Sequence, residues 1–252
     1  MTNAPDYHKA TNKAYAVLVS LRISSLPIST LDIIRRCPRL RVISYTEVCA
    51  RFGISWDEYM AQNVSERGYI CRQGKNAIIY YNDTIDPEII RFTLAHELGH
   101  YLLGHREETS ANDKEANCFA RNLLCPVPIT DYFDLDDVDD CCNIYAVSPP
   151  AAEVVLDKRK LDRYHITTPY YNAMVQLFDL EHLAKEAQLN HYPAQTASAL
   201  LGFTPPGGLM SLAIRMKNYE DQKRRNRREL LKETLTRSAA FRSVARRVLG
   251  EG

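Results

Sequence analysis

Apolar side chains recur at helical spacing along most of this chain, and strand-like alternation is confined to one short region. That region predicts a strand over residues 41–45 and a hairpin whose arms, 68–72 and 76–81, flank a turn containing Gly74. The other apolar stripes predict helices over 8–24, 30–37, 46–52, 55–62, 86–104, 114–125, 149–163, 170–185 and 209–248. The pattern therefore indicates an α+β fold in which a short β-sheet is combined with many helices.

The best-defined of these helices lies between Asp86 and Gly104. Asp86 can accept hydrogen bonds from the first free amides, and Pro87 suits the first helical position, where no amide hydrogen is needed. Gly104 suits the left-handed conformation that follows the last turn. The residues between these ends are apolar on most faces, which is typical of a buried helix.

This buried helix contains the sequence H-E-L-G-H, which has the spacing of a zinc site. His96 and His100 are four residues apart and lie on one face, with about 6 Å between their Cβ atoms. Such a pair suits a tetrahedral zinc ion, which binds imidazole nitrogen at about 2.0–2.1 Å. Glu97 lies about 100° round the helix and is placed to take a proton from the attacking water, which is the general-base role of this motif in metalloproteases. Burying three such side chains without a partner is costly, which favours a metal site over a chance match.

A catalytic zinc site needs a third protein ligand, and the sequence favours Glu115 for this role. The longer pattern, with another histidine six residues after the second, is absent because Arg106 occupies that position. Glu115 lies in the amphipathic stripe 114–125, so packing of this stripe on the first helix can aim its carboxylate at the zinc. Two histidines and one glutamate leave a fourth position for water. The alternatives lie at the helix end and in the polar loop that follows: His105, Glu107 and Glu108.

Two motifs together, R-F-T-L-A-H-E-L-G-H-Y-L-L-G-H and E-A-N-C-F-A-R-N-L-L-C-P, resemble the ImmA/IrrE family of metallo-endopeptidases. The resemblance extends over roughly residues 25–165 and implies a small zincin-like domain of the gluzincin type. It implies one zinc ion per chain, held by His96, His100 and Glu115, with Glu97 as the catalytic glutamate. It also implies that the protein cuts or otherwise relieves a helix-turn-helix repressor, often on a mobile genetic element or beside a stress operon.

The predicted function is therefore hydrolysis of a peptide bond in a specific protein partner, and the resemblance implies that this partner is a helix-turn-helix repressor. Glu97 would take the proton of the attacking water and pass it to the leaving amine, without a covalent intermediate. The alternative is a non-catalytic regulator that keeps the zinc and acts by binding a repressor or DNA.

We expect three segments along the chain. A zinc metallopeptidase domain covers residues 1–165, a helical connector with a Pro-Pro-Gly-Gly hinge covers 166–208, and a basic helical tail covers 209–252. Residues 215–252 hold 12 of the 32 basic side chains and 5 of the 31 acidic ones. Such a tail can bind nucleic acid through phosphate neutralisation or an acidic partner, and a solvated helix is the plainer alternative.

Cysteine usage and hydropathy indicate the compartment. The seven cysteines form an odd set without C-x-x-C spacing, which favours reduced thiols in a cytoplasm. The longest early apolar run, residues 14–20, is short and soon meets Arg22, so we expect no signal peptide, no membrane span and no membrane partner.

Three further features leave alternatives open. By analogy with zincins, in which a sheet edge holds the substrate as an added strand, residues 76–82 are either the substrate edge or an internal strand. The aspartate-rich stretch 131–140 is a calcium site or, since the glycine and closing glutamate of an EF-hand are missing, a solvated acidic face. The donor that stabilises the oxyanion is one of five unranked candidates: Tyr80, Tyr81, Tyr101, His105 and Tyr145.

Overall fold

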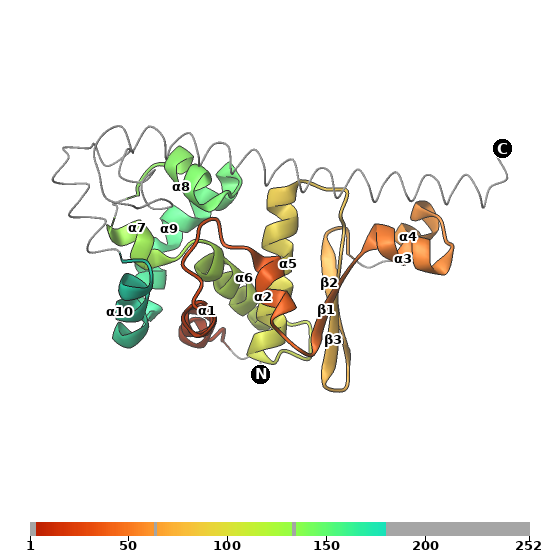
Figure 1. Ribbon diagram of the computed structural model, residues 1–252, viewed down its shortest axis with the longest axis horizontal. Helices are drawn as coiled ribbons and strands as arrows, with labels where there is room; N and C mark the ends of the chain where they lie inside the picture. Colours follow the sequence, from red (N-terminus) through yellow and green to blue (C-terminus); the bar gives the residue numbers. More distant parts are fainter. Residues whose placement is uncertain (1–3, 63–64, 133–134, 180–252) are drawn as a thin grey trace. The chain divides into compact units, whose positions relative to one another are not determined.

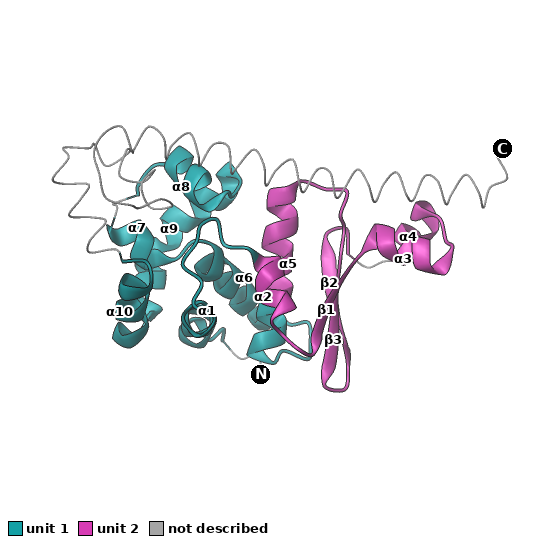
Figure 2. Cartoon of the chain, viewed as in Figure 1, with its two compact units in different colours: residues 1–29, 98–221 teal, residues 30–97, 222–252 magenta. Residues whose placement is uncertain are grey.

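The computed structural model describes residues 4–62, 65–132 and 135–179 (Figure 1). The predicted hinge and the predicted basic tail over 209–252 lie outside the described residues. The chain divides into two units, one made of residues 1–29 and 98–221 and the other of residues 30–97 and 222–252 (Figure 2). The division falls inside helix α5 (Pro87–Leu103), which continues unbroken from one unit into the other.

The second unit contains a three-stranded sheet in the order β1-β3-β2. Strand β1 (Leu40–Ser44) runs parallel to β3 (Asn76–Tyr81), and β2 (Gly68–Gln73) runs antiparallel to it. Gly74 has φ +61° in the turn between β2 and β3, which confirms the predicted hairpin. Alternate residues of β3 are buried, as the period of a half-covered strand requires.

The prediction that residues 76–82 form the substrate edge is wrong, because β3 is the central strand. Its backbone is paired with β1 on one side and with β2 on the other, so it has no edge to offer an added peptide. The alternative, an internal strand, is the one observed. The local hairpin signal could not show this, because the pairing with β1 joins segments more than 30 residues apart in the sequence.

Three short helices complete the described part of this unit: α2 (Thr30–Arg35), α3 (Tyr45–Phe52) and α4 (Trp56–Gln62). The buried carboxylate of Asp83 accepts hydrogen bonds from the amide and the hydroxyl of Thr46, at 3.2 and 2.7 Å. It thereby fixes the start of α3 against the loop that leads out of β3. Ser55 and Glu58 satisfy each other's amides at the start of α4 in a capping box.

Helix α5 has the ends that the sequence predicts. The amide of Glu88 donates to the carboxylate of Asp86 at 3.1 Å, and Gly104 adopts φ +79° directly after the last helical residue. Close packing of β2 on α5 depends on Gly68, where a Cβ atom would lie 2.7 Å from Cγ2 of Thr93 and 2.9 Å from a backbone oxygen of β3.

The described part of the first unit is helical. Besides the end of α5 it contains α1 (Tyr7–Ser20), α6 (Ser110–Leu124), α7 (Val127–Tyr132), α8 (Val138–Tyr145), α9 (Pro149–His165) and α10 (Thr168–Leu177). Helix α1 packs along α6 (Figure 1), where Tyr15 donates to Asn122 at 2.9 Å and accepts from the amide of Val127 at 3.0 Å. Helix α1 ends at Ser20, four residues earlier than predicted, and Arg22 follows with a positive φ of 51°.

The aspartate-rich stretch contains helical structure that the sequence pattern did not reveal. Helix α7 ends at its start, and Asp137 caps α8 by accepting from the amides of Asp139 and Asp140. Helix capping therefore accounts for one of these carboxylates without calcium. The whole arrangement, mostly helical with a small mixed sheet, confirms the predicted α+β class. Among the described helices, none combines the length and apolar character needed to cross a membrane.

A buried ion pair joins α6 to α9. Two guanidinium nitrogens of Arg121 donate to the two carboxylate oxygens of Asp162 at 2.6 and 2.7 Å. The side chain of Asp162 is 3% exposed and that of Arg121 is 13% exposed, so water competes little for either charge. Removing one member should therefore leave an uncompensated charge in the core.

We expect Asp162→Ala to lower the free energy of unfolding by about 3–5 kcal/mol, because it leaves Arg121 buried without its counter-charge. Chemical denaturation measures this change. The matched control is Asp157→Ala on the same helix, where the carboxylate pairs with Lys158 in an exposed position and its loss should change stability little. Equal effects of the two substitutions would contradict a structural role for the buried pair.

Candidate functional site

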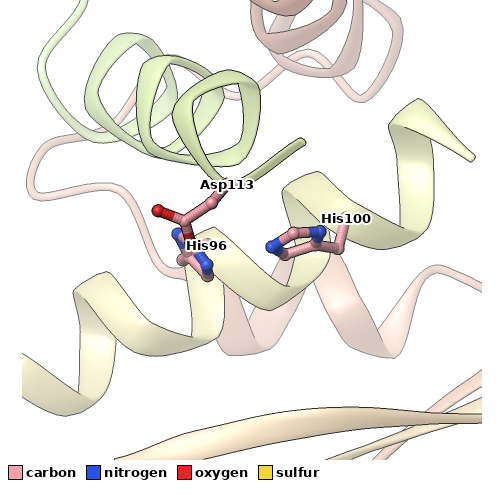
Figure 3. Close-up of side chains that lie close together, drawn as sticks. All are labelled: His96, His100 and Asp113. Atoms are coloured by element: carbon pink, nitrogen blue, oxygen red, sulfur yellow. The ribbon is translucent and has the colours of Figure 1, made fainter. Parts of the chain in front are cut away.

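His96 and His100 lie on adjacent turns of α5, and a carboxylate of α6 lies beside them. The two imidazoles and the carboxylate of Asp113 each offer a ligand atom, and these atoms all lie within 4.8 Å of one another (Figure 3). Both histidines are half-buried and Asp113 is exposed. Within the described residues, this is the group of histidine, cysteine and acidic side chains whose spacing suits a metal ion.

The chemistry of these donors fits zinc. Imidazole nitrogen and carboxylate oxygen are both zinc ligands, and two ligands at about 2.0–2.1 Å in a tetrahedron are about 3.3 Å apart. The observed spread of up to 4.8 Å differs from that by an amount that small side-chain rotations can close. Three protein ligands with one on the exposed side also leave a position that water or substrate can reach.

Asp113 is held in the first turn of α6. Thr109 caps this helix by accepting from the amide of Asn112, and the side-chain amide of Asn117 donates to Asp113 at 3.2 Å from one turn further on. A carboxylate in this position is stabilised by the positive end of the helix dipole. Sequence reasoning missed Asp113, although its first-turn position and its spacing of four residues from Asn117 were signals for an oriented carboxylate.

The structure brings Asp113, and not Glu115, to the two imidazoles. Residues two apart on a helix project about 200° from each other, so these two carboxylates face different surroundings. Glu115 is buried, and its Oε1 accepts from the amide of Asp6 at 2.9 Å while its Oε2 lies 3.1 Å from Nε2 of His105. The role of Glu115 as a zinc ligand stays a prediction, as do those of His96 and His100.

The alternative third ligands have other surroundings. Glu107 and Glu108 are exposed in the loop between α5 and α6 and do not belong to the group around the two imidazoles. His105 is buried beyond the end of α5, with Nδ1 3.1 Å from Nδ1 of His100 and Nε2 at Glu115. His105 therefore contacts the predicted ligand His100 through the Nδ1 atom of that ring.

Glu97, the predicted general base, is buried in α5 with 8% of its surface exposed. It precedes His100 by three residues and therefore lies on a neighbouring position of the same helix surface, while it projects about 100° away from His96. The structure thus has the three motif side chains on neighbouring positions of one well-capped helix.

Gly99, inside the motif, sets the distance between α5 and α6. A Cβ atom at this position would lie 3.0 Å from a ring carbon of Phe119 and 3.3 Å from the Cα and the carbonyl oxygen of Ala116. Two of these three contacts are with backbone, which cannot move aside as a flexible side chain can. The absence of a side chain at Gly99 therefore allows α6 to bring its carboxylates close to His100.

Of the candidate oxyanion donors, Tyr145 belongs to the core. It is fully buried, its hydroxyl lies 2.8 Å from that of Thr130, and burial raises the pKa of its hydroxyl well above the ordinary value. His105 is held between His100 and Glu115. The structure does not rank the remaining candidates, Tyr80, Tyr81 and Tyr101.

Comparison with known families gives a match that covers the candidate site. A model of the Peptidase_M78 family, described as the IrrE N-terminal-like domain, matches residues 49–172. This range includes the two histidines, Glu97 and both carboxylates of α6. Comparisons with curated proteins and with solved structures gave no match.

Gly99→Ala tests the close approach of the two helices. In a helix interior this substitution normally stabilises by about 1 kcal/mol, because alanine has the higher helix propensity. Here we expect destabilisation of about 1–3 kcal/mol from overpacking, together with weaker zinc binding as α6 moves away. Thermal unfolding and zinc titration measure the two effects, and a stabilised variant with unchanged zinc affinity would contradict the packing argument.

Zinc titration also distinguishes the two carboxylates of α6. We expect about one zinc per wild-type chain. Loss of a residue that only supports a metal ligand typically lowers metal affinity ten- to hundredfold, and we expect Asp113→Ala to lower zinc affinity by more than that, because Asp113 would bind the metal itself. Glu108→Ala, in the exposed loop, is the control and should bind as the wild type does. Wild-type affinity in Asp113→Ala, with zinc lost in Glu115→Ala, would instead support Glu115 as the ligand.

Proposed function

Residues 49–172 belong to the Peptidase_M78 family of metallopeptidases, and on that premise we propose that the protein is a zinc-dependent endopeptidase acting on a specific protein partner. The observation that carries the proposal is the grouping of His96, His100 and Asp113, together with the buried Glu97 in the same helix as the two histidines. In this proposal Asp113 is the third ligand, in place of the Glu115 that the sequence favours.

The residues of α5 have separate tasks in this reaction. Zinc, when bound, supplies a Lewis acid that polarises a carbonyl and makes water more acidic. Glu97 accepts a proton from the attacking water, whose oxygen forms the new bond to the peptide carbon. The same carboxylic acid then returns the proton to the amine as the C–N bond breaks, which leaves Glu97 ionised for the next cycle. Water is the nucleophile throughout, so no covalent enzyme intermediate forms.

Burial of Glu97 supports this role. Glu97 is 8% exposed, and electrostatic attraction is stronger where water is excluded. The attraction between its carboxylate and a proton of the attacking water is therefore stronger than it would be in solvent. The exposure of Asp113 leaves one side of the group open to solvent, from which a polypeptide can approach.

We propose a helix-turn-helix repressor as the substrate. The support is the resemblance of the two motifs to ImmA/IrrE metallo-endopeptidases, whose typical partners are repressors of this class. An extended segment of such a partner can pair only with β1 or β2 within the described sheet, because β3 is already paired on both sides.

Glu97→Gln separates catalysis from binding. The amide keeps the size of the side chain but cannot take a proton, so cleavage should fall by about 10²- to 10⁴-fold while zinc content stays at the wild-type level. Elemental analysis gives the zinc content, and mass spectrometry of a co-purified candidate repressor gives the cleavage. Normal relief of repression by a variant that cuts nothing would favour the non-catalytic regulator.

A further inference from the structure

A chain of hydrogen bonds runs from His100 to the first residues of α1. Nδ1 of His100 lies 3.1 Å from Nδ1 of His105, and Nε2 of His105 lies 3.1 Å from Oε2 of Glu115. Oε1 of Glu115 accepts from the backbone amide of Asp6 at 2.9 Å. His105 and Glu115 are 8% and 7% exposed, so solvent competes little for these contacts.

With both histidines neutral, the donors and acceptors along this row of hydrogen bonds have one consistent order. A backbone amide can only donate and a carboxylate can only accept, so Glu115 must accept on both oxygens. Neutral His105 then carries its hydrogen on Nε2 and offers a lone pair on Nδ1. His100 must donate to that lone pair from its own Nδ1, so Nε2 is the unprotonated nitrogen of the His100 ring.

We propose that His105 and Glu115 are positioning residues that fix the tautomer and orientation of His100, so that its Nε2 faces the metal. The inference rests on the proposed zinc site and deepens it. Metal-binding histidines usually donate their other ring N–H to a fixed acceptor, and such a partner strengthens metal binding without touching the metal. Here the acceptor is a second histidine, which is itself held by a buried carboxylate.

The first turn of α1 holds Glu115, the last side chain in this row of hydrogen bonds, in place. Asp6 caps α1 by accepting from the amide of Lys9 at 2.9 Å, and this capped turn presents the amide of Asp6 to Glu115. The ammonium group of Lys9 donates to the carbonyl oxygen of Leu103 at 3.2 Å, which ties the same turn to the end of α5. Residues distant in sequence thus hold Glu115 at a fixed distance from His105.

Three substitutions in the full-length chain test the proposal by zinc affinity, measured in competition with a chromophoric chelator. Glu115→Gln cannot satisfy two donors, because its amide nitrogen accepts nothing. His105→Gln keeps a donor for Glu115 near the position of Nε2 but removes the acceptor for His100. His105→Asn keeps an acceptor near the position of Nδ1. The matched control is Glu108→Gln, a neutralised carboxylate in the exposed loop.

We expect Glu115→Gln and His105→Gln each to bind one zinc about ten- to hundredfold more weakly than the wild type. His105→Asn should retain most of the affinity, and the double variant His105→Gln/Glu115→Gln should be no weaker than the weaker single one, because both act through His100. The visible spectrum of the Co²⁺-loaded protein should change in the two weakened variants and stay unchanged in Glu108→Gln. Thermal unfolding of the metal-free proteins checks that each variant is folded.

Wild-type affinity in both Glu115→Gln and His105→Gln would overturn the inference while leaving the zinc site and the Glu97→Gln result intact. Complete loss of zinc in Glu115→Gln, with no change in His105→Gln, would also overturn it by making Glu115 a ligand. Absence of zinc from the wild type would remove the proposed function and this inference together. If Glu115→Gln does not fold, the difference between His105→Gln and His105→Asn decides the question alone.

Discussion

The close approach of α5 to α6 at Gly99 is the packing contact on which the candidate site depends. A Cβ atom there would lie 3.0 Å from Phe119 and 3.3 Å from the backbone at Ala116, so its neighbours would have to shift by a few tenths of an ångström. Metal ligands need their positions fixed within a fraction of an ångström. The smallest residue of the motif therefore contributes as much to the geometry as its charged ones, although it offers no ligand atom.

Helix α6 carries two carboxylates near its start, and they have different partners. Asp113 lies with His96 and His100, and Asn117 donates to it from one turn further along. Glu115 faces the other way, is buried, and holds His105. One helix can thus supply a metal ligand and, two residues later, a side chain that holds the partner of another ligand. This is possible because residues two apart in an α-helix project about 200° from each other. The capped start of α1 completes this support.

Much of the fold could be predicted where neighbouring residues in the sequence determine the backbone conformation. Asp86 and Gly104 define the ends of α5, and Gly74 defines the hairpin, because caps and tight turns depend only on neighbouring residues. The central position of β3 could not be predicted, since it depends on a distant strand. The short helix α8 was hidden by aspartates, which are poor helix formers in general but good caps.

The same distinction applies to the site. The H-E-L-G-H spacing predicts that His96, Glu97 and His100 lie together, because one helix fixes all three. The choice between Asp113 and Glu115 depends on how α6 is rotated against α5, which is a matter of tertiary packing that the spacing within one helix does not determine. The resemblance to ImmA/IrrE proteins correctly predicts the family, while the substrate rests on the proposal above.

X-ray absorption spectroscopy of the zinc-loaded chain identifies the atoms that hold the metal. We expect nitrogen and oxygen ligands at about 2.0–2.1 Å, outer-shell scattering from two imidazoles, and no sulfur. Zinc–sulfur distances of about 2.3 Å would contradict this expectation, because they would move the metal to cysteines. A spectrum without imidazole scattering would contradict it equally, since His96 and His100 would then not hold the ion.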